Sequence, residues 1–432
     1  MRAFVASLLV CLSSGLSLAG ELPRAIIPDD FPVPGATSVL LGRDLFFDPI
    51  LSGNQNTACA SCHSPATASA DALPLALGEG ATGTGTARRA NGTARRIARH
   101  TPHLFNLGAA EFKTLMQDGR VEADPSSRFG IRLPKGQFLE RPVTSSLAAQ
   151  ALLPMVSADE MAGLPGSNPI ADAVAQGRIT GMNGAWQMIA QRVSDTPQYR
   201  QRFDWLIGPS EPLHITHITQ ALADFITYEY RATDSPFDAF LRGDDTALSN
   251  DALRGMALFY GKASCATCHA GPFQTDHSFH AIGLPQIGPG KAHGPATSDH
   301  GRGAITGQSH DNYRFRTPSL RNVALTAPYG HSGAFSDLRS MIRHHLDPLT
   351  SLAEYMIETS DIDQGAMADF DEILAITAAI EIPAVTLSDR DVTALVSFLN
   401  ALTDTSFSSR RLGPPLTVPS GLPMQGIETP PS

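Results

Sequence analysis

Two short strings with the same pattern, Cys-x-x-Cys-His, lie far apart in this chain. They are "TACASCHSP", with Cys59, Cys62 and His63, and "GKASCATCHAGP", with Cys265, Cys268 and His269. With 5 cysteines and 14 histidines among 432 residues, chance alone would produce roughly 0.002 such strings. The repeated pattern therefore indicates a specific chemistry.

Four kinds of site use cysteines and a histidine in this way: a disulfide framework, a structural zinc site, a redox-active dithiol and a covalently attached haem. A zinc site needs a second pair of ligands at short range, which neither motif has. A thioredoxin-like dithiol has no use for the adjacent histidine and belongs in a βαβ context that this sequence lacks. Haem attachment uses all three side chains, because the thiols add to the vinyl groups and the imidazole coordinates iron. The motifs therefore predict two covalently bound haem c groups, with His63 and His269 as iron ligands.

Residues 1–19 have the pattern of a secretory signal peptide. Arg2 precedes the apolar stretch "AFVASLLVCL", and small residues at 17–19 form a cleavage site. Removal of this segment also removes Cys11, so the haem motifs use every cysteine that remains. We therefore expect an exported, periplasmic protein without disulfides. No later stretch has the roughly 18 apolar residues of a membrane span, and the net charge of −10 argues against a nucleic-acid partner.

Apolar residues at helical spacing predict helices in three stretches. These are "HITHITQALADFITYEY" (214–230), "LSNDALRGMALFYGK" (248–262) and "SDRDVTALVSFLNALTD" (388–404). Ser249 is expected to cap the second helix, and Ser388 with Asp391 forms a capping box for the third. Strand-like alternation is scarce, so the expected fold class is mainly α with long ordered loops.

The chain is long enough for two domains, each with one haem motif. Charged and turn residues at 241–249 predict the boundary, which gives an N-terminal domain of residues 20–243 and a C-terminal domain of residues 244–405. Residues 406–432 are rich in proline and predict an extended or loosely packed tail.

Over nearly its whole mature length the chain resembles the bacterial dihaem cytochrome c peroxidase and MauG superfamily. The strings that carry this resemblance are "DSPFDAFLRGD", "GMALFYGKASCATCHAGP", "TDHSFHAIGL", "FRTPSLRNVALTAPYGHSGAF", "DGR" and "AAQALLPMVSADEMAG". The resemblance implies two cytochrome c-like haem domains with a calcium ion between them. It also implies that the N-terminal haem reacts with peroxide and that the C-terminal haem relays electrons.

The resemblance assigns catalytic roles to Gln150 and Glu160, which match a glutamine and a glutamate over the peroxide-reacting haem. A carboxylate beside an open iron position can take a proton from H₂O₂ and return it to the leaving oxygen. Without the resemblance, Gln150 could equally link helices and Glu160 could be an ordinary solvated carboxylate. We therefore expect both side chains to lie near His63.

The sixth ligand of the C-terminal haem is the position at which this chain departs most from its relatives. The resemblance places a methionine or tyrosine fourteen residues after the histidine of "PYGHSG", and here the count from His331 ends at His345. A His/His iron has a lower potential than a His/Met iron. His344 is the rival, because one residue on a helix rotates the side chain by about 100°; Met341 is a third candidate, and two exposed histidines at a helix end remain an alternative.

Two further departures concern the region between the haems. Relatives carry tryptophan before "DGR", whereas this chain has Gln117. The resemblance also implies a calcium ion held by backbone oxygens at Thr326 and Pro328, which suits the preference of calcium for oxygen. An asparagine ligand of that ion aligns with His100, so the calcium site is expected to be altered.

These observations predict a periplasmic dihaem peroxidase that reduces H₂O₂ with electrons from a small redox protein, a cytochrome c or a cupredoxin. Two alternatives stay open. One is a MauG-like enzyme that oxidises residues of a partner protein, and the other is a dihaem electron carrier without an open iron. A homodimer is also left open.

Overall fold

The computed structural model describes residues 21–425, apart from 93, 135, 291–297, 356–361, 363–364 and 410–411. The predicted signal peptide and residues 426–432 of the predicted tail lie outside the described residues. Within the described part, no helix is both long enough and apolar enough to cross a bilayer.

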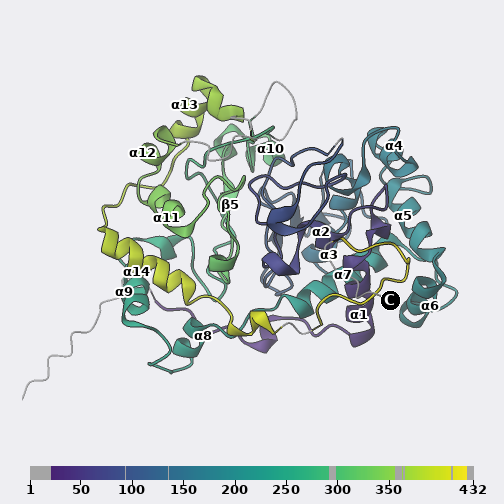
Figure 1. Ribbon diagram of the computed structural model, residues 1–432, viewed down its shortest axis with the longest axis horizontal. Coiled ribbons are helices and arrows are strands. Elements are labelled where there is room, and N and C mark those ends of the chain that lie inside the picture. The colour runs from purple at the N-terminus through teal and green to yellow at the C-terminus, as the bar shows by residue number, and fades with distance from the viewer. Residues whose placement is uncertain are drawn as a thin grey trace, which may run out of the picture.

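The described residues are mainly helical, which confirms the predicted fold class. The helices are α1 (Ala36–Phe47), α2 (Cys59–Cys62), α3 (Ser146–Gln150), α4 (Pro169–Ala175), α5 (Ala185–Ser194), α6 (Pro197–Ile207), α7 (Ile215–Glu229), α8 (Pro236–Leu241), α9 (Asn250–Phe259), α10 (Gly303–Thr306), α11 (Leu338–Leu346), α12 (Pro348–Ala353), α13 (Phe370–Ala378) and α14 (Asp389–Asn400). The strands form two small antiparallel sheets: β1 (Thr114–Leu115), β2 (Val121–Ala123) and β3 (Ile131–Arg132) in one, β4 (Phe279–His280) and β5 (Phe315–Arg316) in the other. Long ordered loops connect these elements (Figure 1).

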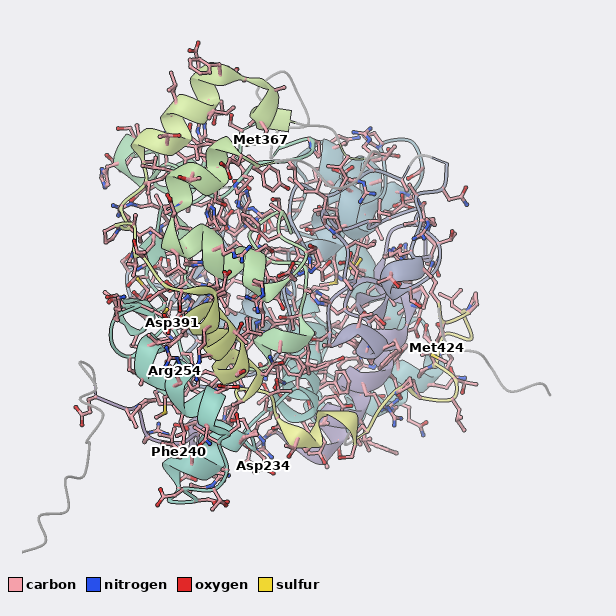
Figure 2. The ribbon with its side chains drawn as sticks, turned by 60° about the vertical axis from the view of Figure 1, so that its left-hand side comes forward. Asp234, Phe240, Arg254, Met367, Asp391 and Met424 are labelled. Atoms are coloured by element: carbon pink, nitrogen blue, oxygen red, sulfur yellow. The ribbon has the colours of Figure 1, made fainter. Side chains whose placement is uncertain are left out.

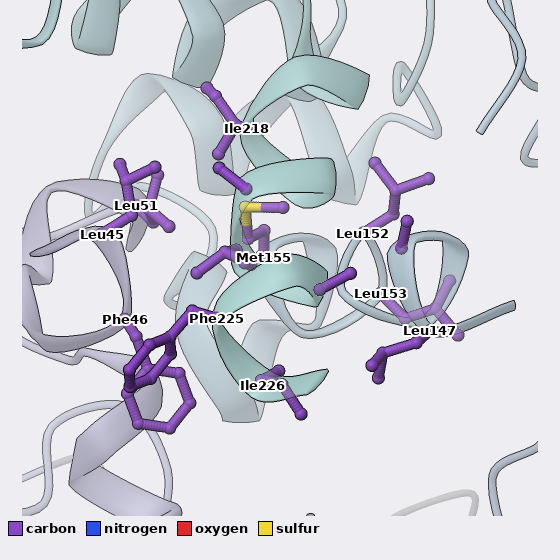
Figure 3. Close-up of a cluster of buried hydrophobic side chains, with 14 of the residues drawn as sticks. Leu45, Phe46, Leu51, Leu147, Leu152, Leu153, Met155, Ile218, Phe225 and Ile226 are labelled. Atoms are coloured by element: carbon purple, nitrogen blue, oxygen red, sulfur yellow. The ribbon is translucent and has the colours of Figure 1, made fainter. Parts of the chain in front are cut away.

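The N-terminal domain is built around the crossing of α1 and α7. The apolar face predicted from the helical spacing of stretch 214–230 is buried in α7, at Ile215, Ile218, Leu222, Phe225 and Ile226. At the crossing point Gly42 lies directly against α7, since a Cβ there would be 1.8 Å from the carbonyl oxygen of Ala221. Figure 3 shows Phe225 and Ile226 packed between α1 and the α3 region, where Leu147 and Met155 complete the core.

The C-terminal domain repeats this construction with α9 and α14. The predicted caps are confirmed: Ser249 Oγ accepts a hydrogen bond from Ala252 N (3.1 Å), and Ser388 and Asp391 form the capping box. At the crossing, a Cβ on Gly255 would lie 1.9 Å from the carbonyl oxygen of Ala394. Figure 2 shows the two helices side by side, joined at the surface by the Arg254–Asp391 ion pair.

The boundary between the domains differs from the predicted position at 241–249. Helix α8 lies before that position, yet its Phe237 is fully buried in the C-terminal core, where it packs edge-on against Phe398. Phe237 N also donates to the carbonyl oxygen of Ala401 (3.0 Å). The boundary therefore lies between α7 and α8, because α8 carries an apolar side chain that only the second core can bury.

Both described ends of the chain cross to the other domain. Leu22 packs against the C-terminal core, whereas the segment 412–425, which we call the C-terminal strap, returns to the N-terminal domain. Val418 of the strap is only 5% exposed, and Ser420 Oγ donates to Asp48 Oδ1 (2.6 Å). In Figure 1 this yellow segment lies against the N-terminal half. The described strap is not loosely packed, because Val418 is buried in the N-terminal core and Leu412, Leu422 and Met424 pack against it, whereas Leu416 is exposed.

Candidate active site

The N-terminal Cys-x-x-Cys-His motif forms one wall of a cavity of about 150 Å³. Helix α2 is a single turn, closed by a hydrogen bond from His63 N to the carbonyl oxygen of Cys59 (2.8 Å), so all three side chains reach the cavity. His63 Nδ1 lies 2.9 Å from the carbonyl oxygen of Ser69, and burial lowers the pKa of this imidazole. The ring is therefore neutral with its proton on Nδ1, which leaves Nε2 as a free metal ligand.

Gln150 and Glu160 line the same cavity, as the resemblance predicted. Gln150 ends α3, and its Oε1 is buried without a hydrogen-bond partner among the described residues, so it is available to a bound molecule. Glu160 lies in the π-helical turn Ala158–Ala162, which is closed by a hydrogen bond from Ala162 N to the carbonyl oxygen of Ser157 (2.9 Å). Such π-turns occur frequently at functional sites.

The apolar part of the cavity comes from the N-terminal core. Phe46, Leu147, Met155 and Ile226 belong both to that core and to the cavity lining (Figure 3). Rigid side chains of α1, α3 and α7 thus surround the polar groups. A macrocycle bound here would contact apolar side chains and would be shielded from water.

The cavity also contains two arginines that the sequence did not single out, Arg99 before the "DGR" string and Arg120 within it. Arg99 and Arg120 both line the cavity, and both pair with Asp118, at 2.9 Å each. Arg99 also pairs with Asp299 of the C-terminal domain at 2.6 Å. Burial opposes the charge of Arg99, but the two carboxylates outweigh burial and raise its pKa. Both arginines were in reach of the sequence analysis, since Arg120 belongs to the quoted "DGR" and Arg99 precedes His100.

Gln117, which replaces the expected tryptophan, lies between this cavity and the C-terminal domain. It lines the cavity, and its Nε2 donates to the carbonyl oxygen of His331 (3.2 Å). On the far side, His331 stacks on Phe315 with ring centroids 4.0 Å apart and planes 9° apart. The inter-domain contact is therefore polar at Gln117 and aromatic immediately behind it.

In the C-terminal motif, His269 faces His345. Their ring centroids are 6.4 Å apart. An imidazole nitrogen binds a first-row metal at about 2.0 Å, so two imidazoles on one iron place their ring centres roughly 6.3 Å apart. His269 Nδ1 lies 3.1 Å from the carbonyl oxygen of Gln274, and His345 Nδ1 lies 2.9 Å from that of Met341. Both Nδ1 atoms thus have backbone partners, the Pro318 backbone also contacts the His269 ring, and the separation of the two rings fits one iron.

His344 is occupied in another way. Its Nδ1 lies 3.0 Å from Ser351 Oγ and its Nε2 lies 2.8 Å from the carbonyl oxygen of Ile282, and the residue is fully buried. Neither nitrogen is left for a metal, so the structure brings His345 and not His344 to His269. Met341 packs against the C-terminal core.

Comparison with known proteins identifies the family. Residues 36–246 match the family described as di-haem cytochrome c peroxidase. The methylamine utilization protein MauG of Methylorubrum extorquens is 31% identical over 385 residues, which cover 86% of this chain and 89% of that protein. The chain belongs to the di-haem cytochrome c peroxidase family.

Other members of the family span most of the chain as well. The cytochrome c551 peroxidase of Pseudomonas aeruginosa is 29% identical and covers 70% of this chain. A solved structure of a MauG-like protein associated with microbial copper homeostasis has a TM-score of 0.60 at 26% identity, and the match covers 90% of this chain and 94% of that one. The protein is therefore a dihaem oxidoreductase of the cytochrome c peroxidase type, and its predicted mainly α fold is confirmed.

The thiols of this dihaem protein are unsuited to the other chemistries that the sequence left open. None of the four described cysteines forms a disulfide. Burial raises the pKa of Cys59, Cys62 and Cys265 to about 12, so none of the three is a reactive thiolate. In the described part of the chain, one group of potential metal ligands contains three residues, Cys268, Asp276 and His280. Its His280 already contacts carboxylates through both ring nitrogens, at 2.9 and 3.1 Å.

The residues at the expected calcium site fit this ion poorly. Thr326 is buried and its Oγ1 donates to the carbonyl oxygen of Val323 (3.1 Å), so its hydroxyl already has a backbone partner. A Cβ on Gly333 would lie 2.9 Å from Pro328 Cγ and 3.5 Å from His100 Cβ, so His100 is near Pro328, as the alignment implies. An imidazole in place of an amide oxygen suits calcium poorly. Calcium binding at Thr326 and Pro328 stays a prediction.

Proposed function

We propose that this protein is a periplasmic dihaem c peroxidase that reduces H₂O₂ to water with electrons from a small redox protein. The observation that supports the proposal is that Gln150 and Glu160 share one cavity with Cys59, Cys62 and His63. The overall reaction consumes two electrons and two protons for each H₂O₂ and yields two molecules of water.

The residues of the cavity would share the reaction as follows. The bound haem supplies the iron that binds peroxide and the route for electrons. The Glu160 carboxylate accepts a proton from one peroxide oxygen and returns it to the other, so that the O–O bond breaks with water as leaving group. The Gln150 amide orients the peroxide by hydrogen bonding, and the apolar wall from the N-terminal core excludes bulk water.

The C-terminal site would receive the electrons. His269 and His345 would hold its iron through one imidazole each, and the haem would supply a site that takes up and passes on electrons. A cytochrome c or a cupredoxin is the proposed donor. Attachment of both haems through the four cysteines predicts a pyridine haemochrome and a mass with two porphyrin additions.

Glu160→Gln tests the acid–base role. We expect peroxide turnover to fall by roughly 10²- to 10⁴-fold, because the amide cannot carry the proton, while both haem spectra stay unchanged. Asp159→Asn is the matched control, since it removes a carboxylate from the same turn at a residue that does not line the cavity. Full turnover in Glu160→Gln would rule out the proposed role of this residue.

The second candidate function is MauG-like oxidation of residues on a partner protein. Two observations support it: the 31% identity to MauG, and the position of His345 opposite His269, where the resemblance places methionine in the peroxidases. Two assays separate the candidates: steady-state peroxide consumption with a reduced cytochrome, and peroxide-dependent mass changes in a co-purifying protein. The electron carrier that the sequence left open is disfavoured, because the family consists of peroxidase-type enzymes.

A further inference from the structure

The segment Leu77–Glu79 lies between the N-terminal haem motif and the turn that carries Glu160. On one side, Cys62 Sγ lies 3.3 Å from the carbonyl oxygen of Leu77. On the other side, Glu79 N donates to the carbonyl oxygen of Asp159 (2.9 Å). A Cβ on Gly78 would lie 2.8 Å from Glu160 Cα, so the two backbones are in direct contact. This segment is therefore in backbone contact with the turn that carries Glu160.

Arg88 holds the segment from behind. It is 1% exposed, and it donates from Nε to the carbonyl oxygen of Leu77 (2.5 Å) and from Nη2 to that of Gly78 (2.7 Å). Nη1 donates to the carbonyl oxygen of Gly83 (3.0 Å). These partners are all neutral oxygens. Burial of a full positive charge against neutral partners is costly, and here hydrogen bonds from all three guanidinium nitrogens offset that cost and fix the group in one orientation.

The C-terminal strap completes this support. Gln425 Oε1 accepts from Arg88 Nη1 (3.0 Å), and Gln425 Nε2 donates to the carbonyl oxygen of Asn56 (2.6 Å). Asn56 Nδ2 in turn donates to Glu79 Oε1 (2.9 Å), which closes a ring of contacts around Leu77–Glu79. Figure 2 shows the end of the strap, at Met424, on the N-terminal domain.

We propose that Arg88 is a positioning residue for Glu160 and that Gln425 of the C-terminal strap locks Arg88 in place. This inference rests on the proposed acid–base role of Glu160. Without Arg88 or Gln425, the segment Leu77–Glu79 relaxes and no longer presses Gly78 against Glu160. The carboxylate then loses its alignment with peroxide, whereas the haem and the open iron position are retained.

The test compares Arg88→Lys and Gln425→Ala with Arg89→Gln, an exposed neighbour of Arg88. We expect both test variants to lose about 10- to 100-fold in kcat/KM for peroxide, because small displacements of a catalytic group cost rates of this order. Cyanide affinity and the haem spectra of both test variants are expected to stay unchanged. Arg89→Gln is expected to keep its kcat/KM for peroxide, its cyanide affinity and its haem spectra. Gln425→Ala keeps the test valid if Arg88→Lys fails to fold.

A double-mutant cycle gives the decisive result. In a Glu160→Gln background, Gln425→Ala is expected to cause no further loss of the residual rate, because both changes remove the same contribution. Losses that multiply, or full activity in both test variants, would overturn the positioning role. Failure of the proposed function is distinguishable, since Glu160→Gln alone would then keep its turnover.

Discussion

The three histidines proposed to bind iron share one local feature, a contact between Nδ1 and a backbone carbonyl oxygen. Nδ1 of His63, His269 and His345 faces a backbone carbonyl oxygen, of Ser69, Gln274 and Met341 respectively. Each carbonyl fixes the ring tautomer and its orientation, as is usual for histidine ligands of metals. For His269, burial and the nearby His345 lower the pKa to about 4, which keeps the ring neutral and ready to coordinate.

Substitution of His345 tests the proposed His/His iron. We expect His345→Met to raise the reduction potential of the C-terminal haem, because thioether ligation favours the reduced state. The rise should be a fraction of the roughly 0.8 V over which different axial ligands set haem potentials. Spectroelectrochemistry measures this shift. As a control, His344→Ala is expected to cost about 2 kcal/mol of stability through its two lost hydrogen bonds and to leave the low-spin EPR signal intact. An unchanged potential in His345→Met would exclude His345 as ligand.

At the scale of elements, each domain uses a glycine where two helices cross. Gly42 lets α1 approach α7, and Gly255 lets α9 approach α14. The flanking sequences are similar too, since Leu-Phe-Phe follows three residues after Gly42 and Leu-Phe-Tyr follows three residues after Gly255. Because the two helices of each pair lie close together, they form a closed apolar core. The first cysteine of each motif, Cys59 or Cys265, packs against that core.

Gly42→Ala is expected to destabilise the protein by about 1–3 kcal/mol, because the added methyl group meets a backbone carbonyl that cannot move without its helix. Thr37→Ala, an exposed position on the same helix, is the control and is expected to change stability by less than about 0.5 kcal/mol. Urea denaturation followed by circular dichroism measures both. Equal effects of the two substitutions would show that the crossing has room for a side chain.

At the scale of the whole molecule, the two domains are held by exchanged chain ends and by a buried ionic network. Leu22 and the C-terminal strap each pack on the opposite domain, and Arg99 bridges Asp118 and Asp299 across the interface. Burial raises the pKa of Asp299, but Arg99 outweighs burial and the net effect holds that pKa below its usual range. The network therefore contributes stability while Asp299 is ionised.

The sign of this pKa shift predicts a specific acid sensitivity. A depressed carboxyl pKa contributes stability that is fully present above the unfolded value of about 3.9 and is lost as the pH falls towards the folded value. Asp299→Asn is expected to destabilise the protein by about 3 kcal/mol at pH 7, and this gap should narrow by about 1 kcal/mol between pH 5 and pH 3. Urea titrations at several pH values measure the gap, with the exposed Asp245→Asn as control. If the difference in unfolding free energy between the protein and Asp299→Asn did not depend on pH, the lowered pKa of Asp299 would be contradicted.

Local features of the sequence were sufficient to predict much of this protein. The two Cys-x-x-Cys-His motifs, the caps at Ser249 and Ser388 and the buried face of α7 depend on residues within one or two turns of each other, so their outcome follows from local chemistry. The placement of Gln150 and Glu160 beside His63 was predictable only through the resemblance, because nothing local relates these positions.

The remaining features depend on which distant backbone meets each side chain. Only the fold decides that His344 donates to Ile282 while His345 faces His269, since both residues lie on one helix with the same composition around them. Only the fold buries Phe237 in the second core and carries Gln425 to Arg88. The sequence by itself predicted the haem motifs and determined the capped helices, whereas the tertiary structure decided which histidine faces His269 and which distant residues surround the turn of Glu160, because hydrogen-bond partners far apart in the chain become neighbours only on folding.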